Sequence, residues 1–265
     1  MTKVRVRNIL SLSGGKDSTA LAIYMRDRVP EMEYVFCDTE KELPETYDYL
    51  ARIEAVLGKP ITTLKNDGRG FDHWLSVFGG YLPSARMRWC TRHLKLHPFE
   101  HYVGDSQVVS YIGIRADEDD RTGYISTKPN IKPVYPFVED GICYPDVERI
   151  LNESGLGLPP YRVWRSRSGC YFCFFQQKIE WVGLLENHPD LYDLASRYEK
   201  VDEKTGKRFT WSERESLLEL ARPERVAAIK AEYEHAAKHA NVSTGRLAEL
   251  LIENVGPQAC LICHL

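Results

Sequence analysis

A glycine-rich hexapeptide near the N-terminus constrains the fold of this chain more than any other feature. Ser13-Gly14-Gly15-Lys16-Asp17-Ser18 lies between an apolar run at 6–12 and a helical pattern at 19–28. Two glycines let a backbone approach a phosphate closely, and the first turn of a helix presents unpaired N–H groups to an anion. The sequence therefore predicts a strand, a phosphate-binding loop and a helix in succession.

The polar side chains of this loop favour nucleotide binding. Lys16 supplies a cation, Ser13 and Ser18 supply hydroxyl groups, and Asp17 can hold Mg²⁺ or cap the helix. The string is neither the G-x-x-x-x-G-K-[ST] loop nor the G-x-G-x-x-G loop of other nucleotide-binding folds. The alternative is a Gly-Gly turn followed by a helix cap, with no ligand.

Apolar runs alternate with helical patterns through the first half of the chain. Further strands are predicted at 34–37, 61–64 and 108–114, and a helix at 44–57. This alternation predicts an α/β fold with a mostly parallel, doubly wound sheet. Later segments are helical, and helices are predicted at 145–154, 177–187, 190–200, 212–221, 223–239 and 243–253. We expect a nucleotide-binding core over 1–140 and a mainly helical region over 141–265.

Charge and hydropathy limit the class of protein. The formal net charge of −3 gives no strongly basic surface in bulk. No apolar run reaches the roughly 20 residues that span a bilayer, and the first residues lack the apolar core of a signal peptide. We therefore expect a cytoplasmic protein with no membrane partner.

Four further segments follow the loop in an order that resembles a known superfamily. They are Asp38-Thr39 with Glu42-Leu43-Pro44-Glu45-Thr46, Trp89-Cys90-Thr91-Arg92 with Lys95 and Pro98, Gly113-Ile114-Arg115 through Arg121, and Ser168-Gly169-Cys170. Together with the SGGxDS string, they resemble the PP-loop ATP pyrophosphatase and phosphoadenosine-phosphosulfate (PAPS) reductase superfamily. Glu40 stands where its D-T-G motif has glycine. The resemblance covers about two-thirds of the chain and implies an adenine nucleotide alpha hydrolase-like fold.

The loop, the Asp38 segment and the Gly113–Arg121 segment provide the candidate nucleotide site. Asp38 and Glu42 follow a parallel strand, where open α/β sheets bind ligands, and arginine suits bidentate phosphate recognition. A helix cap at Asp38 and solvated arginines paired with nearby carboxylates are the alternatives. The predicted catalytic residues are Lys16, Asp17, Asp38 and Arg115. The predicted ATP- and Mg²⁺-binding residues are Ser13, Gly14, Gly15, Lys16, Asp17, Ser18, Asp38, Glu42, Arg115 and Arg121.

Five of the seven cysteines form a candidate metal site. Cys170 and Cys173 form one Cys-x-x-Cys pair, Cys260 and Cys263 form another, and Cys90 lies at a superfamily position. Four thiolates can hold a [4Fe–4S] cluster or tetrahedral zinc, and the spacing leaves both open. The resemblance favours the cluster. One tail cysteine suffices as the fourth ligand, and the sequence does not select between them.

Two departures from the reductases shape the functional expectation. The E-C-G-I-H segment of PAPS reductases and the adjacent cysteines of the APS-reducing branch are absent. The chain is most similar to the ATP-pyrophosphatase component of Dnd/Ssp-type DNA phosphorothioation systems. That resemblance implies adenylation of a DNA backbone phosphate, a cysteine desulfurase as sulfur donor, and other modification-system proteins as partners. The alternatives are a PAPS/APS sulfonucleotide reductase, tRNA thiolation or another adenylyl transfer, and a non-catalytic nucleotide-binding module stapled by metal.

Overall fold

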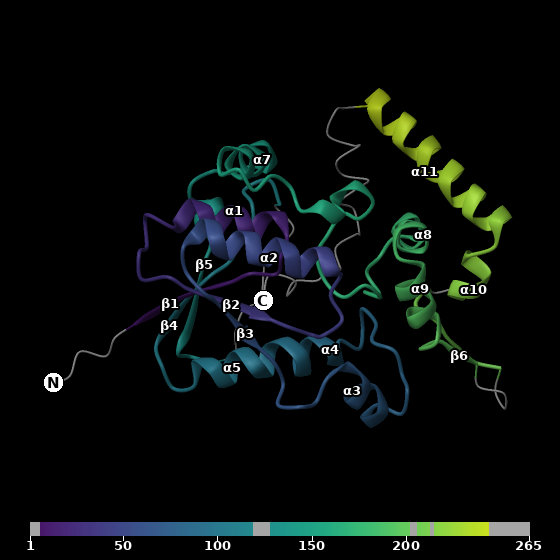
Figure 1. The fold of residues 1–265 in the computed structure, drawn as a ribbon, viewed down its shortest axis with the longest axis horizontal. Coiled ribbons are helices and arrows are strands. Elements are labelled where there is room, and N and C mark those ends of the chain that lie inside the picture. The colour runs from purple at the N-terminus through teal and green to yellow at the C-terminus, as the bar shows by residue number, and fades with distance from the viewer. Residues whose placement is uncertain (1–5, 119–127, 202–205, 213–214, 244–265) are drawn as a thin grey trace.

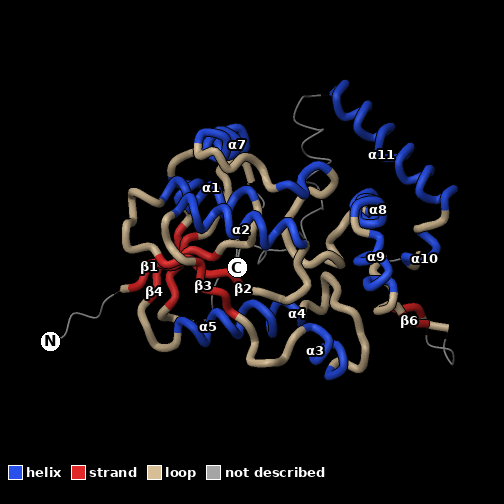
Figure 2. The backbone as a smooth tube through the Cα atoms, in the orientation of Figure 1, coloured by secondary structure: helices blue, strands red, loops and turns tan. Residues whose placement is uncertain are grey.

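A five-stranded parallel sheet forms the centre of the molecule (Figures 1 and 2). The computed structural model describes residues 6–118, 128–201, 206–212 and 215–243. The strand order is β3-β2-β1-β4-β5, and every neighbouring pair is parallel. Helices cover both faces, so the predicted doubly wound α/β fold is confirmed. The strands are β1 (Arg7–Ser11), β2 (Glu33–Cys37), β3 (Ile61–Leu64), β4 (Val108–Tyr111) and β5 (Ile131–Val134).

Two apolar layers hold the helices on the sheet. On one face, α1 (Lys16–Met25), α2 (Pro44–Leu57) and α7 (Tyr144–Glu153) share a buried core with β1 and β2. On the other face, α5 (His97–Val103) packs Phe99 and Val103 against β1, β2 and β4. Burial of both faces explains the near-continuous apolar runs of the central strands. The phosphate loop, which follows β1, therefore lies at the carboxyl edge of the sheet.

Most predicted elements form, with shifted ends. The bounds predicted for α2 and β3 are those observed, whereas α1 begins three residues earlier than predicted and β4 ends at Tyr111. β5 was not predicted, because Pro133 interrupts its pattern; proline is tolerated there because β5 is an edge strand. Three helical segments of 71–96 were also not predicted as such: α3 (Phe71–Val77), α4 (Trp89–Thr91) and a π-helix (Arg92–Leu96).

The rest of the described chain is mainly helical, as predicted. Its elements are α6 (Pro136–Glu139), a 3₁₀ helix (Pro160–Val163), α8 (Lys178–Asn187), α9 (Pro189–Ser196), the short hairpin β6 (Lys200–Val201) and β7 (Arg208–Phe209), α10 (Leu217–Leu220) and α11 (Pro223–Ser243). The helix predicted at 243–253 lies outside the described residues. No described helix is both long and apolar enough to cross a membrane.

A second core joins the C-terminal helices to the sheet domain. Phe71, Trp89, Phe172 and Trp211 stack or tilt against one another, with ring centroids 4.4–6.4 Å apart. This cluster links α3 and α4 to the Cys170 segment and to the C-terminal helices. The predicted division at residue 140 stays a prediction, and α7, just beyond it, packs against α1.

Candidate functional site

The phosphate loop is a compact turn between β1 and α1 that is closed by its own hydroxyl groups. The hydroxyls of Ser13 and Ser18 lie 3.2 Å apart, and the Thr19 hydroxyl donates to the Gly15 carbonyl at 2.7 Å. Gly14 has φ +69°, and a Cβ there would meet the Thr46 side chain at 2.7 Å. A side chain at Gly14 is therefore excluded both by the backbone conformation and by the close packing of the loop against α2.

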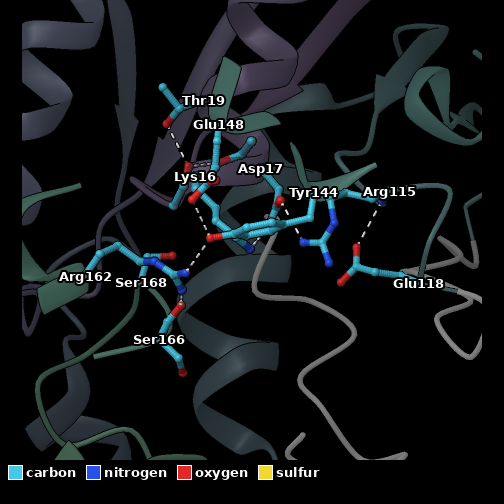
Figure 3. A network of polar contacts seen from close by, with 12 residues as sticks. Lys16, Asp17, Thr19, Arg115, Glu118, Tyr144, Glu148, Arg162, Ser166 and Ser168 are labelled. Carbon is cyan, nitrogen blue, oxygen red and sulfur yellow. Dashed lines mark hydrogen bonds and ion pairs between the residues drawn. The ribbon is translucent and has the colours of Figure 1, made fainter. Parts of the chain in front are cut away.

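A buried charge cluster lies at the start of α1 (Figure 3). The Lys16 ammonium contacts one carboxylate oxygen of Asp17 at 2.9 Å, and the Arg115 guanidinium contacts the other at 3.0 Å. Arg115 is only 2% exposed and also bonds Asp117 at 2.8 Å. The two cations are thus paired with two carboxylates, and ammonium and guanidinium groups are also side chains that recognise phosphate. The structure thus brings together three of the predicted catalytic residues: Lys16, Asp17 and Arg115.

Glycine at position 113 allows this convergence. Gly113 follows β4, and a Cβ there would lie 3.1 Å from the Asp17 carbonyl oxygen and 3.3 Å from the Ser18 nitrogen. Both neighbours are backbone atoms that cannot rotate away. Because Gly113 has no side chain, the segment that carries Arg115 can pack directly against the backbone of Asp17 and Ser18.

Three further residues, Tyr144, Glu148 and Arg162, border the charge cluster, and none of them was predicted as a site residue (Figure 3). The Tyr144 ring lies 5.2 Å from the Lys16 ammonium and 5.4 Å from the Arg115 guanidinium carbon, within cation–π range. Its hydroxyl donates to Glu148 at 2.7 Å and accepts from Arg162 at 3.2 Å. Residues of α7 and the 3₁₀ helix therefore fix the ring that faces both cations.

Asp38 follows β2 and is held by three groups. Its carboxylate accepts from the Tyr47 hydroxyl at 2.7 Å and from the Glu40 backbone N–H at 2.8 Å, and Lys65 lies 3.2 Å away. These contacts resemble a turn cap as much as a ligand site. Asp38 remains only 8% exposed at the carboxyl edge of the sheet. The structure places it at the predicted edge, and its role in binding or catalysis stays a prediction.

Glu40 is the one described non-glycine residue with positive φ, at +61°. It stands where the resembling motif has glycine. A Cβ in this left-handed conformation costs about 1–2 kcal/mol. Its side chain makes a 2.9 Å ion pair with Lys65, an exposed contact worth at most about 1 kcal/mol.

We expect Glu40→Gly to have a higher free energy of unfolding than Glu40→Ala, by about 0.5–1 kcal/mol. Both variants lose the Lys65 pair, but only alanine keeps a Cβ at positive φ. Urea denaturation of the two proteins measures the difference. An alanine variant as stable as the glycine variant would show that position 40 carries no backbone strain.

Glu42 connects the edge of the sheet to the cysteine segment. Burial raises the pKa of its carboxyl group, although the nearby Lys95 charge and the Thr39 hydrogen bond act in the opposite direction. Thr39 bonds one Glu42 oxygen at 2.9 Å and lies 3.1 Å from the Cys170 sulfur. The other Glu42 oxygen is buried and has no hydrogen-bond partner. Glu42 therefore lies near Cys170, linked to it through Thr39, with one buried carboxylate oxygen that a ligand could use.

The three described cysteines of the predicted metal site are Cys90, Cys170 and Cys173, and the charge of Cys173 affects the pKa of the other two. Burial raises the pKa of the Cys90 thiol to about 12 and that of Cys170 well above its usual value. The Cys173 charge acts on both in the same direction. Thiols in such surroundings stay protonated until a metal displaces the proton. The donor chemistry fits a thiolate-bound metal, yet the described residues contain no group of three or more ligating side chains arranged around one point.

The remaining predicted residues fall elsewhere. Arg121, Cys260 and Cys263 lie outside the described residues. Cys37 is buried in β2, and its thiol contacts the Lys95 carbonyl. Cys143 is the N-cap residue of α7. Neither Cys37 nor Cys143 was predicted as a ligand.

Residues 7–133 match the family model described as the phosphoadenosine phosphosulfate reductase domain. The match contains the phosphate loop, Asp38, Glu42, Cys90 and Arg115, and it supports the superfamily that the residue matches indicate. Tyr144 and the turn at Cys170 lie beyond it.

Two curated relatives and two solved structures are similar to the chain. An uncharacterized protein of Methanocaldococcus jannaschii is 26% identical over 197 residues, 69% of this chain and 45% of that protein. An uncharacterized nin region protein of Escherichia phage lambda is 29% identical over 155 residues, 47% of this chain and 52% of that protein. The chain thus spans about half the length of these relatives.

The structures are a PAPS reductase from Candida auris in complex with phosphate and the U34-tRNA thiolase NcsA from Methanococcus maripaludis with its [4Fe-4S] cluster. The reductase is 14% identical, with a TM-score of 0.46, over 58% of this chain and 76% of its own. The thiolase is 15% identical, with a TM-score of 0.43, over 74% of this chain and 71% of its own.

Proposed function

We propose, taking a phosphoadenosine phosphosulfate reductase domain at 7–133 as the premise, that this chain is an ATP pyrophosphatase that activates an acceptor for sulfur insertion. The acceptor we propose is a backbone phosphate of DNA. One observation carries the proposal: the phosphate loop lies against the segment that bears the cysteines. The Ser168 hydroxyl contacts Ser13 of the loop at 3.1 Å, two residues before Cys170.

The loop and its charge cluster suit cleavage between the α- and β-phosphates of ATP. An acceptor oxygen attacks the α-phosphorus, the bond to the bridging oxygen breaks, and pyrophosphate leaves with its electron pair. Lys16 and Arg115, both near Asp17, would neutralise the charge that develops on pyrophosphate. Asp17, with Asp38 at the same edge of the sheet, would hold Mg²⁺, which would supply further positive charge for the phosphates.

Sulfur insertion then replaces AMP on the activated acceptor. A phosphate oxygen is a poor leaving group, whereas AMP leaves readily, so adenylation makes the substitution feasible. The sulfur nucleophile attacks the acceptor phosphorus, and AMP departs with the former acceptor oxygen. We propose a cysteine desulfurase as the source of the sulfur, and other proteins of the modification system as further partners.

Cys90, Cys170 and Cys173 would hold the metal, completed by Cys260 or Cys263. A [4Fe–4S] cluster would supply an electron-accepting centre for sulfur, whereas zinc in its place would only hold the cysteines together. The role of the chain is to keep these thiols close to the loop. Thr39 and Glu42 do so from the sheet, since Thr39 contacts both Glu42 and the Cys170 sulfur.

A single set of reactions tests this function. Anaerobic protein is mixed with ATP, Mg²⁺, plasmid DNA, cysteine and a cysteine desulfurase, and both pyrophosphate and phosphorothioate linkages are measured. We expect both products, each dependent on ATP. Pyrophosphate release that requires tRNA in place of DNA would move the assignment to tRNA thiolation. Thiol-dependent sulfite release from PAPS, without pyrophosphate release from ATP, would make the chain a sulfonucleotide reductase. ATP binding without turnover would leave a non-catalytic module.

A further inference from the structure

A chain of three buried hydroxyls runs from the phosphate loop toward the cysteines. Ser18 donates to the Gly15 carbonyl at 3.3 Å, and its oxygen lies 3.2 Å from the Ser13 hydroxyl. With the Ser18 hydrogen on the Gly15 carbonyl, the hydrogen of Ser13 can point to Ser18. Ser168 in turn donates to Ser13 at 3.1 Å. All three serines are at most 6% exposed, so water competes little for these bonds.

Ser168 lies tightly against the loop. A Cβ added to Gly15 would meet the Ser168 hydroxyl at 2.9 Å. The Tyr161 hydroxyl donates to the Gly14 carbonyl at 2.7 Å, so the same segment contacts the loop at a second point. The segment that begins at Tyr161 is therefore hydrogen-bonded to the phosphate loop at two points, Gly14 and Ser13.

The other end of this segment is fixed to the loop that follows β2. Between Ser168 and Cys170 stands Gly169, with φ +123°, a conformation that favours glycine. The Cys170 carbonyl accepts from the Arg165 guanidinium at 2.7 Å, and the Tyr171 N–H donates to the Lys41 carbonyl at 2.8 Å. The Cys173 N–H closes the turn by donating to the Cys170 carbonyl at 3.0 Å. We call residues 168–173 the cysteine turn.

We propose that Ser168 is a positioning residue that couples occupancy of the phosphate loop to the order of the cysteine turn. The inference rests on the proposed function, because it takes the loop to bind a nucleoside triphosphate. When a phosphate occupies the loop, the hydrogen of Ser13 turns from Ser18 to a phosphate oxygen. The Ser13 oxygen stays available as the acceptor for Ser168, so a directed chain forms from Ser168 through Ser13 to phosphate.

The sign of the coupling follows from this direction. Successive hydrogen bonds in a low-dielectric site polarise one another, so phosphate binding strengthens the bond from Ser168 to Ser13. A firmer bond at Ser168 restricts the short link to Cys170 and lowers the frequency with which the turn opens. By linkage, anything that orders the cysteine turn raises the affinity for nucleotide by the same factor.

Hydrogen–deuterium exchange of the full chain tests the coupling. The probe is α,β-methylene-ATP with Mg²⁺, which cannot be cleaved between the α- and β-phosphates. The reporters are the hydrogen-bonded amides of Tyr171 and Cys173. In the unmodified protein we expect the probe to slow exchange in the loop, and to slow it about fivefold or more at both reporters, the lower range of common coupling strengths.

Ser168→Ala removes the donor to Ser13 and leaves the hydroxyls of the loop in place. We expect the probe still to protect the loop, which also shows that the variant is folded, while its effect on the two reporters falls below about twofold. Thr19→Ala is the matched control. Thr19 also donates a hydroxyl to the loop, at the Gly15 carbonyl, but this hydroxyl is not a link in the chain from Ser168 through Ser13, so transmission is expected to persist.

The outcomes separate the two proposals. Loop protection without any change at the reporters of the unmodified protein would overturn the coupling and leave the proposed function intact. If the probe slowed exchange at Tyr171 and Cys173 in Ser168→Ala as much as in the unmodified protein, Ser168 would not be the residue that couples the loop to the cysteine turn. A probe that neither binds in calorimetry nor protects the loop would overturn the proposed function, and the coupling with it.

Discussion

Lys16→Ala is expected to lower the rate of pyrophosphate release from ATP by about a hundredfold or more, the usual loss when one group that stabilises transition-state charge is removed. Lys16 lies in the first turn of α1, only 7% exposed, with its ammonium 2.9 Å from Asp17. Negative charge on pyrophosphate grows as the α–β bond breaks. A cation in a buried site stabilises that charge more than it stabilises bound ATP, so kcat falls more than affinity.

The fold is expected to survive this change, because Asp17 keeps its 3.0 Å pair with Arg115. Asp17→Ala is a less informative variant, since it leaves two buried cations without their common carboxylate. Lys132→Ala, at an exposed position of β5, is the matched control and is expected to turn over ATP normally. Turnover by Lys16→Ala within threefold of the unmodified rate, in a steady-state pyrophosphate assay, would remove the loop from the mechanism.

The fold could be predicted from sequence where local pattern and tertiary packing agree. Both bounds of α2 could be predicted, because Pro44 suits the first turn and Gly58, at φ +63°, ends the helix. β5 could not, because its proline is acceptable only at a sheet edge, and edge position is a property of the assembled sheet. The π-helix Arg92–Leu96 has no sequence signature of its own.

The candidate site divides along a similar line. The loop residues could be predicted because their spacing is local, and Arg115 because it belongs to a recognisable segment. Tyr144 and Ser168 could not, because the importance of each arises from contact with a loop more than a hundred positions away, and Arg162 could not, because it acts through its bond to Tyr144. The helical pattern that follows Tyr144 predicted α7, but it did not predict that the Tyr144 ring faces Lys16. Only the cysteines, as a rare residue type in repeated spacing, identified the second half of the chain as functional.

Serine in place of Cys90, Cys170 or Cys173 is expected to reduce the iron of anaerobically purified protein from about four atoms per chain to below one, with sulfur-transfer activity lost in parallel. The three thiols come from two separate segments: Cys90 precedes the π-helix, and the other two lie in one turn. Cys90 and Cys170 are held protonated by burial, and Cys173 adds repulsion once thiolates form. Such a set is costly to ionise without a metal, so a missing ligand should release the metal rather than leave it partly bound.

Two cysteines outside the site provide the control for this prediction. Cys143→Ser keeps a hydroxyl at the N-cap of α7, and Cys37→Ala removes a thiol whose pKa burial raises to about 12 within the core. Both variants are expected to retain iron, with only a packing cost at Cys37. The double variant of Cys260 and Cys263 decides how the centre is completed, because either tail thiol alone can replace the other. Full iron in that double variant would place the fourth ligand elsewhere. Stoichiometric zinc without iron, in protein never exposed to air, would make the centre a Cys₄ zinc site and confine its role to holding the cysteine turn against the phosphate loop.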